Sequence, residues 1–161
     1  MRKSNGTIEV FAVHSPQERS ALCERVLRAL PDWFGVEESL VKYVRDAAGQ
    51  QVFAARLDGQ EAGFVAIREH TEWAAELCVM GVLPWAHRKG VGRALVEQCE
   101  QACRAMGKEY FTVKTLADTH PDEGYAGTRR FYLAMGFTPL EVFPTLWDEA
   151  NPCLLMAKYL G

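Results

Sequence analysis

The spacing of hydrophobic residues alternates along the chain between the 3.6-residue period of amphipathic helices and the short apolar runs typical of strands. Read in order, these segments predict β-α-α-β-β-β-α-β-α-β-β, without an internal repeat or a linker. The predicted helices cover 16–30, 36–44, 91–106 and 128–135, the predicted strands cover 8–13, 51–57, 61–67, 71–82, 110–116, 137–138 and 153–159, and polar loops are expected at 117–127 and around 144–152. Because helices alternate with hairpins, we expect one α/β domain over residues 1–161, with a mixed sheet covered on both faces.

Residues with special backbone preferences mark several of these boundaries. The run S-P-Q-E at 15–18 is typical of a helix start, with serine as cap, proline at the first position and glutamate completing a capping box. The D-G dipeptide at 58–59 predicts a tight hairpin turn. Gly107 and Gly136 predict helix ends, because glycine readily adopts the left-handed conformation. The longest predicted strand contains Gly81, near which we expect a bulge or a splayed edge.

Composition and charge narrow the class of protein. The hydrophobic share of 48% and the charged share of 24% are typical of a globular domain. The net charge of -3, without a lysine-rich run, argues against a nucleic-acid partner. No apolar run is long enough to cross a bilayer, and the basic start leads into polar residues 4–7 rather than into the apolar core of a signal peptide. We therefore expect a cytoplasmic protein without a membrane partner.

The cysteines form an odd set without a C-x-x-C pair: Cys23, Cys78, Cys99, Cys103 and Cys153. Cys99 and Cys103 would share one helix face, which makes a metal pair conceivable, but the four histidines are scattered and complete no cluster. We favour buried thiols in a reducing compartment and expect no metal.

The turn H-R-K-G-V-G at 87–92, between a predicted strand and a predicted helix, has the properties of an anion site. The first amides of a helix have no intrahelical acceptor, and the helix dipole adds partial positive charge there. Gly90 and Gly92 let an anion approach the backbone closely, so a pyrophosphate fits this pattern. The dinucleotide fingerprint fails at Leu95, the P-loop also fails, and a purely structural turn remains the alternative. The basic side chains around this point are His87, Arg88, Lys89 and Arg93.

The wider segment V-L-P-W-A-H-R-K-G-V-G-R-A-L at 82–95 resembles motif A of the GNAT superfamily of N-acetyltransferases, which reads (Q/R)-x-x-G-x-(G/A) after a strand ending V-x-P. Gly90 and Gly92 occupy the two small positions, and His87 stands where Gln or Arg is usual. The segment F-Y-L-A-M-G-F at 131–137 resembles the family's second signature, and the two segments occur in the family's order. The resemblance implies the GNAT fold, with a mostly antiparallel central sheet flanked by helices on both faces.

The resemblance also implies the cofactor. Acetyl-CoA is expected as the co-substrate, with its pantetheine arm in a gap between two adjacent parallel strands and with no metal. The main-chain N–H of Val82 is expected to stabilise the oxyanion of the tetrahedral intermediate. The residues expected to bind the cofactor are Val82, His87, Arg88, Lys89, Gly90, Val91, Gly92 and Arg93.

Two side chains match the family's proton-transfer groups. Glu76 is expected to act as the general base, directly or through water, and its apolar neighbours predict a raised pKa. The alternative is a solvated residue or an ion-pair partner. Tyr132 matches the general acid that protonates the CoA sulfur, and the alternative is core packing. Cys78 and Cys153 are candidate nucleophiles for a covalent route, but neither has a histidine nearby in sequence, so direct transfer is favoured.

The acetyl acceptor is less well determined by the sequence. The resemblance implies a primary amine, on a small molecule or on a protein. The loop at 117–127 offers an acidic rim that would attract an amine, or it simply faces water. Aromatic residues near predicted loops would wall an acceptor pocket or a subunit interface, which leaves a homodimer open: Trp33, Phe34, Trp85 and Trp147. A non-catalytic acyl-CoA sensor is the alternative function, but the presence of both a candidate base and a candidate acid favours the enzyme.

Overall fold

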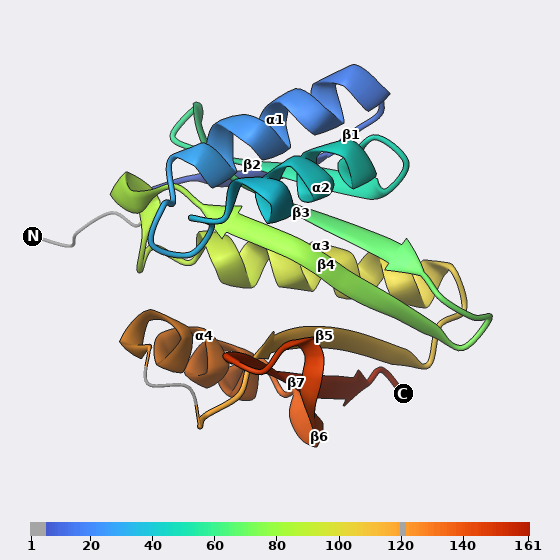
Figure 1. The fold of residues 1–161 in the computed structure, drawn as a ribbon. Helices are drawn as coiled ribbons and strands as arrows, with labels where there is room; N and C mark the ends of the chain where they lie inside the picture. The colour runs from blue at the N-terminus through green and yellow to red at the C-terminus, as the bar shows by residue number, and fades with distance from the viewer. Residues whose placement is uncertain (1–5, 120–121) are drawn as a thin grey trace, which may run out of the picture.

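Seven strands form one sheet in the computed structural model, which describes residues 6–119 and 122–161 (Figure 1). The strands are β1 Ile8–Val13, β2 Gln51–Leu57, β3 Gln60–Glu69, β4 Ala74–Val82, β5 Tyr110–Leu116, β6 Thr138–Asp148 and β7 Asn151–Tyr159. Their order across the sheet is β1-β2-β3-β4-β5-β7-β6. Neighbouring strands are antiparallel except for β4 and β5, which are parallel. The predicted mixed, mostly antiparallel sheet is confirmed.

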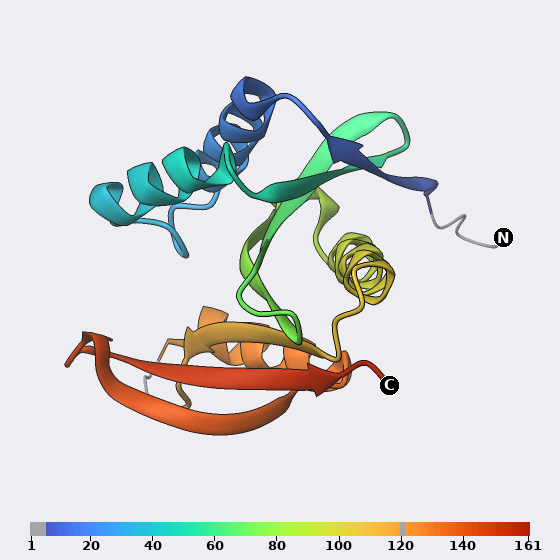
Figure 2. The same cartoon turned by 90° about the vertical axis from the view of Figure 1, so that its right-hand side faces the viewer.

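Helices cover both faces of this sheet. In the described part of the chain they are α1 Pro16–Arg28, α2 Glu37–Ala47, α3 Val91–Ala105 and α4 Glu123–Ala134, with a short 3-10 helix, η1 Pro84–Ala86, before α3. The helices α1 and α2 pack on one face, and α3 and α4 pack on the other (Figures 1 and 2). The order of helices and strands expected from the spacing of apolar residues is also confirmed.

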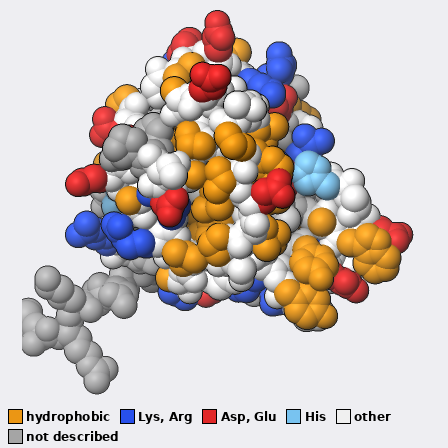
Figure 3. All heavy atoms as spheres, turned by 60° about the horizontal axis from the view of Figure 1, so that its bottom comes forward, with side chains coloured by type: hydrophobic (Ala, Val, Ile, Leu, Met, Phe, Trp, Pro, Cys, Tyr) orange, Lys and Arg blue, Asp and Glu red, His pale blue; other side chains and the backbone are white. Residues whose placement is uncertain are grey.

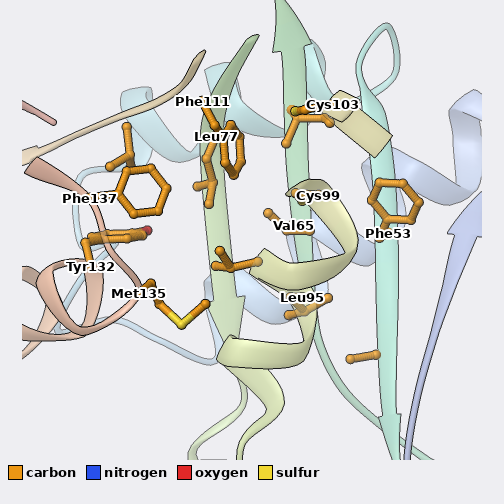
Figure 4. Packing of buried hydrophobic residues seen from close by; sticks show 14 of the residues in the cluster. Phe53, Val65, Leu77, Leu95, Cys99, Cys103, Phe111, Tyr132, Met135 and Phe137 are labelled. Carbon is orange, nitrogen blue, oxygen red and sulfur yellow. The ribbon is translucent and has the colours of Figure 1, made fainter. Parts of the chain in front are cut away.

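Two hydrophobic clusters lie on opposite sides of β2 and β3, because successive side chains of a strand point to opposite faces. Phe64 belongs to the cluster beneath α1 and α2. Phe53 and Val65 belong to the cluster beneath α3 and α4, where they pack near Leu95 and Cys99 (Figure 4). Burial on both faces explains why these strands read as nearly continuous apolar runs in the sequence.

The predicted helix cap and turns form, but the capping box is only half made, because the Glu18 carboxylate accepts no hydrogen bond from the Ser15 amide within the described residues. The Ser15 hydroxyl accepts a hydrogen bond from the Glu18 amide at 3.3 Å. The hairpin turn between β2 and β3 uses left-handed residues, with φ of 52° at Asp58 and 80° at Gly59. Gly107 and Gly136, with φ of 77° and 95°, follow the ends of α3 and α4.

The predicted start of α4 at residue 128 is wrong, because the helix begins at Glu123. Asp122 is its N-cap, and its carboxylate accepts a hydrogen bond from the Tyr125 amide at 3.1 Å. The glycines Gly124 and Gly127 weaken helical propensity over this first turn, which hides the helix in the sequence. The predicted loop at 117–127 is therefore shorter, and its His120 lies outside the described residues.

The predicted loop around 144–152 is also wrong, because β6 extends to Asp148 and forms a hairpin with β7. A strand at the edge of a sheet tolerates Pro139 and Pro144, since their missing N–H groups interrupt no central ladder. Nearly every residue of β6 is exposed, so the strand lacks the apolar alternation of a half-buried strand.

The strand β4 begins at Ala74, three residues after its predicted start. The Thr71 hydroxyl accepts hydrogen bonds from the amides of Trp73 and Ala74, both at 3.1 Å. This side-chain turn replaces ladder pairing at these residues and closes the connection between β3 and β4.

Candidate active site

The two parallel strands separate half-way along their length. Residues Ala74–Leu77 of β4 pair with Tyr110–Val113 of β5, and the pairing then stops. Beyond it β4 continues to Val82 and β5 continues to Leu116, which pairs with β7 on its other side. The predicted splayed edge is therefore present, and it leaves a gap in the middle of the sheet.

The bulge in β4 lies where its pairing with β5 stops, whereas the sequence predicted an irregularity near Gly81. The register with β3 shifts between Ala66 and Ile67, so Cys78 is the extra residue of a bulge. The glycine at 81 has a packing role instead, because a Cβ there would lie 2.7 Å from the Val26 side chain of α1.

The main-chain groups of Val82 face this gap. Leu83 donates a hydrogen bond to the Ala62 carbonyl at 2.7 Å, one residue beyond the opposed pair Gly63 and Val82. In an antiparallel ladder this pattern marks a pair that exchanges no hydrogen bonds with each other. The N–H and C=O of Val82 therefore point away from β3, toward the side on which β5 has diverged.

The glycine turn follows directly, and its backbone is arranged as the anion-site interpretation requires. Arg88 and Gly90 have left-handed φ angles of 61° and 88°, and α3 begins at Val91. The first hydrogen bond of the helix runs from the Ala94 amide to the Gly90 carbonyl at 3.1 Å. The amides of residues 91–93 therefore have no acceptor within the helix. Gly90 is needed for its positive φ, which a residue with a side chain rarely adopts.

Gly92 serves close packing as well as access to the backbone. A Cβ at this position would lie 3.3 Å from the Phe131 ring of α4. The start of α3 is thus held close to α4 beside the gap. Of the basic side chains predicted here, His87, Arg88 and Arg93 line the cavity described below. The Lys89 ammonium does not, and it lies 5.9 Å from the centre of the Trp85 ring.

His87 occupies the position where the family usually has Gln or Arg. It lines the cavity, and one of its ring nitrogens binds the end of β4. Its Nε2 lies 2.6 Å from the Val82 carbonyl oxygen. Because a carbonyl oxygen only accepts hydrogen bonds, Nε2 carries the hydrogen. The ring also meets Trp33 edge-on, with a centroid separation of 5.9 Å. His87 therefore connects the turn to the end of β4 and to the α1–α2 linker.

A cavity of about 1170 Å³ passes through the gap. One end is formed by the glycine turn and by residues 127–132 of α4. The other end is formed by the α1–α2 linker at 30–36, by α2, by the last residues of β5, by the start of α4 at 122–125 and by the β6–β7 hairpin at 146–151. Seen from the side of β6 and β7, hydrophobic side chains gather in a central band, with acidic and basic side chains around it (Figure 3).

Tyr132 lines the cavity and is 5% exposed. Its ring packs edge-on against Phe131 and Phe137, with centroid separations of 5.3 and 5.5 Å, and its hydroxyl points away from α4 toward the strand that carries Leu77 (Figure 4). The hydroxyl has no hydrogen-bond partner among the residues that the structure describes. Burial raises the pKa of Tyr132, so the phenol keeps its proton at physiological pH and remains able to donate it.

Glu76 lies in the segment of β4 that pairs with β5, and it is 9% exposed. Its carboxylate accepts hydrogen bonds from the Lys114 ammonium, at 3.2 Å to each oxygen, and lies 2.5 Å from His70 Nε2. It does not line the cavity, whereas Lys114 does. The ion-pair arrangement named above as the alternative is thus present, and the role of Glu76 as a base stays a prediction.

Three residues of the cavity wall were not singled out by sequence reasoning. Lys114 is the lone charged residue of the run Y-F-T-V-K-T-L, and this isolation was a usable signal. Thr115, in the same run, has a buried hydroxyl without a partner in the described part of the chain. Tyr125 donates its hydroxyl hydrogen to the Trp33 carbonyl at 2.8 Å and so joins α4 to the α1–α2 linker. No local pattern predicts this contact between residues 92 positions apart.

The cysteines are free thiols, and they are buried as expected except for Cys78, which is half-buried. Burial, followed by the charge of Glu76, raises the pKa of Cys78 to about 12, and burial also raises the pKa of Cys153. Thiols with raised pKa values are poor nucleophiles at neutral pH, which argues against a covalent route. Within residues 6–119 and 122–161, no group of His, Cys, Asp or Glu could hold a metal ion. Over the same residues, no helix is long and apolar enough to span a membrane.

A sheet opened between two parallel strands, with a glycine turn and a helix start at the opening, is the arrangement that the resemblance to the GNAT superfamily implies. The sequence profile of the acetyltransferase (GNAT) domain matches residues 48–139, and the chain belongs to this family. An uncharacterized N-acetyltransferase of Chlorobaculum tepidum is 29% identical over 119 residues, which are 72% of this chain and 66% of the relative. The matched region thus falls just short of two thirds of that relative's length.

Solved structures share the fold. A GNAT-family acetyltransferase from Desulfovibrio desulfuricans has a TM-score of 0.81 and 21% identity, over 96% of this chain and 100% of that chain. A GNAT-family acetyltransferase from Elizabethkingia anophelis, solved with acetyl-CoA bound, has a TM-score of 0.67 and 14% identity, over 98% and 99% of the two chains. The resemblance drawn from the two sequence segments is confirmed.

Proposed function

We propose that this protein is an N-acetyltransferase that moves an acetyl group from acetyl-CoA directly to a primary amine. The observation that carries the proposal is the gap between β4 and β5, with the main-chain groups of Val82 facing it and the glycine turn at its end. Membership of the GNAT acetyltransferase family supports the reaction class, and the acetyl-CoA bound to a structural neighbour supports the co-substrate.

The turn is proposed to hold the pyrophosphate of CoA. The amides of Val91, Gly92 and Arg93 would donate to phosphate oxygens, because they have no acceptor in the helix and carry the positive end of its dipole. Gly90 sets the path of the chain. The side chains of Arg88 and Arg93 line the cavity and would neutralise charge. The remaining predicted contacts, from His87 and Lys89, are secondary, because the ring of His87 already binds the end of β4.

The chemistry is proposed to take place where the cavity crosses the gap. The amine nitrogen attacks the thioester carbon, and the oxyanion that forms accepts a hydrogen bond from the Val82 amide. The C–S bond then breaks, and the departing thiolate takes the proton of the Tyr132 hydroxyl. The unpartnered, protonated state of this buried phenol supports its role as the general acid.

The proton of the attacking amine is proposed to reach Glu76 through water. Glu76 lies on the face opposite to Ala75 and Leu77, which pack beneath α3 and α4. It therefore lies on the sheet face that α1 and α2 cover. The end of the cavity at the α1–α2 linker, which we call the acceptor end, lies on the same face, and the end at the glycine turn is called the cofactor end. Lys114 stands at the cavity wall against the carboxylate, so a direct contact between Glu76 and the amine is not part of the proposal.

The proposal is tested by two measurements on the purified protein. Calorimetry with CoA measures association, and the loss of thioester absorbance measures transfer from acetyl-CoA to a panel of primary amines. We expect CoA binding and amine-dependent loss of the thioester. Binding without loss for any amine would instead support the acyl-CoA sensor, and absence of CoA binding would remove the pyrophosphate assignment. The free thiols are consistent with a reducing compartment, and we propose the cytoplasm.

A further inference from the structure

Five aromatic side chains line the acceptor end of the cavity, together with aliphatic and polar residues. Trp33 and Phe34 come from the α1–α2 linker, Tyr43 from α2, Tyr125 from α4 and Trp147 from the β6–β7 hairpin. Five rings from four separate parts of the chain thus surround one volume. A wall of this composition favours a flat apolar ligand, because aromatic rings offer large contact area and defined edge and face geometries.

Most of these rings are held in place before a ligand arrives. Phe34 and Tyr43 meet edge-on at a centroid separation of 5.9 Å. The Tyr125 hydroxyl is fixed on the Trp33 carbonyl, and the Trp33 ring is fixed against His87. Burial raises the pKa of Tyr43, and burial raises the pKa of Tyr125 to about 12, so both phenols are neutral at physiological pH. Trp147, which is 44% exposed, is the least constrained of the five.

The charges at this end of the cavity limit the ligand further. Within the described residues, Lys114 is the cationic side chain that lines the cavity away from the glycine turn, and its charge is already matched by Glu76. The carboxylates that line the cavity are Asp32, Asp122 and Asp148. Asp148 already accepts hydrogen bonds from Asn151 at 2.8 and 3.1 Å, and Asp122 caps α4. An acceptor that carries a carboxylate would find no unmatched cation, whereas an ammonium entering past these acids would be attracted.

From these walls and charges we infer that the acceptor is a small primary monoamine whose body is an aromatic ring. The inference rests on the proposed function. The ring would lie among the five aromatic side chains, and the amine would point toward the gap. Its nitrogen forms the new C–N bond as the C–S bond of acetyl-CoA breaks, with one amine proton lost and CoA released as the thiol. A polycation fits less well, because its additional ammonium groups would lose water against apolar rings.

The test compares two amines that differ by one ring. We expect kcat/KM for 2-phenylethylamine to exceed that for ethylamine by about 30-fold, which corresponds to burying most of one phenyl ring. Spermidine and a short peptide with an N-terminal phenylalanine complete the panel. Equal values for the two matched amines would overturn the inference. A clear preference for spermidine, or for the peptide, would also overturn it in favour of a polyamine or a protein N-terminus.

Variants of the aromatic wall localise the preference. Trp147→Ala should reduce the ratio of the two kcat/KM values by about 5- to 10-fold, and Trp147→Phe should keep most of it, because a ring remains in place. Trp73→Ala is the matched control, since Trp73 is 53% exposed in the β3–β4 connection and does not line the cavity. An unchanged ratio in Trp147→Ala, with the folded state intact by circular dichroism, contradicts the proposed ring site.

The two levels of the proposal fail in different ways. If CoA binds and no amine causes loss of the thioester, the proposed transferase function is wrong and the acceptor inference falls with it. If ethylamine or spermidine is acetylated as well as 2-phenylethylamine, the transferase function stands and only the aromatic acceptor is wrong.

Discussion

The two ends of the cavity are built in opposite ways. The proposed cofactor end is centred on one continuous segment at 82–95, beside α4, and the groups proposed to bind there are main-chain amides positioned by the helix start and by two glycines. The acceptor end combines the α1–α2 linker, the start of α4 and the β6–β7 hairpin, and its key groups are side chains. Main-chain groups are the same for every sequence, whereas side chains vary, so the first end suits a shared cofactor and the second suits a particular substrate.

Burial differs within the acceptor end itself. The strands β2 and β3 are mostly buried between two hydrophobic clusters, and Trp33, Phe34 and Tyr43 of the acceptor end pack against the cluster beneath α1 and α2. The strand β6, which leads into the hairpin of the acceptor end, is exposed along nearly its whole length. A well-packed frame resists added atoms, and an exposed wall accepts changed side chains at small cost in stability. The variants below test this contrast.

Gly92→Asp should have the largest effect. The new Cβ would lie 3.3 Å from Phe131, and the carboxylate would repel the pyrophosphate at the helix start. We expect affinity for CoA to fall by more than about 100-fold, measured by calorimetry. Gly49→Asp is the control, because its nearest neighbour would be 3.9 Å from the new Cβ and its φ is not positive. Retained CoA affinity in Gly92→Asp would place the phosphates elsewhere.

Tyr132→Phe removes the phenol hydroxyl from the wall of the cavity, between the cofactor end and the acceptor end. We expect kcat to fall by about 10- to 1000-fold while the affinity for CoA is unchanged, because only a proton donor is lost. Tyr159→Phe, at a residue 64% exposed, provides the matched change outside the cavity. Unchanged turnover in Tyr132→Phe would leave the ring with a packing role alone.

The cofactor end could be predicted from the sequence because its information is local. A strand, a glycine turn and a helix start follow one another between Val82 and Leu95, and each has a known backbone preference. Tyr132 was named through the resemblance of the segment at 131–137 to the family's second signature, and its role as the general acid stays a prediction. What sequence reasoning missed here is the ring of His87, whose partner is the Val82 carbonyl five residues earlier.

The acceptor end could be predicted only in part, because its contacts are long-range. Trp33, Phe34 and Trp147 were named as candidate pocket residues and do line the cavity, whereas Trp85 does not. The ion pair between Glu76 and Lys114 joins residues 38 positions apart on two parallel strands. Its formation depends on the register of those strands, which no pattern within either strand specifies.

Glu76→Gln separates a base from a structural ion pair. We expect kcat to fall by about 10- to 100-fold if the carboxylate receives the amine proton, with a loss of about 1–3 kcal/mol in the free energy of unfolding from the weakened contact with Lys114. Glu100→Gln is the control. Glu100 is a buried carboxylate of α3 that lies outside the cavity and accepts a hydrogen bond from the Lys158 ammonium at 2.7 Å. Both variants should lose stability in urea unfolding, and only Glu76→Gln should lose turnover. If turnover in Glu76→Gln equals that of the control, the base role is wrong.

Tyr125→Phe should have the smallest effect, and it acts on the acceptor end alone. The change removes the hydrogen bond to the Trp33 carbonyl and loosens the α1–α2 linker without altering the shape of the ring. We expect KM for the amine to rise about 3-fold and the free energy of unfolding to fall by about 1 kcal/mol, while the affinity for CoA stays constant. Tyr110→Phe, at an exposed residue of β5, should change neither quantity. The Trp33 ring also contacts His87 of the glycine turn, so a change in the linker could reach the cofactor end. If Tyr125→Phe lowered the affinity for CoA as much as the affinity for the amine, the prediction that the change acts on the acceptor end alone would be wrong.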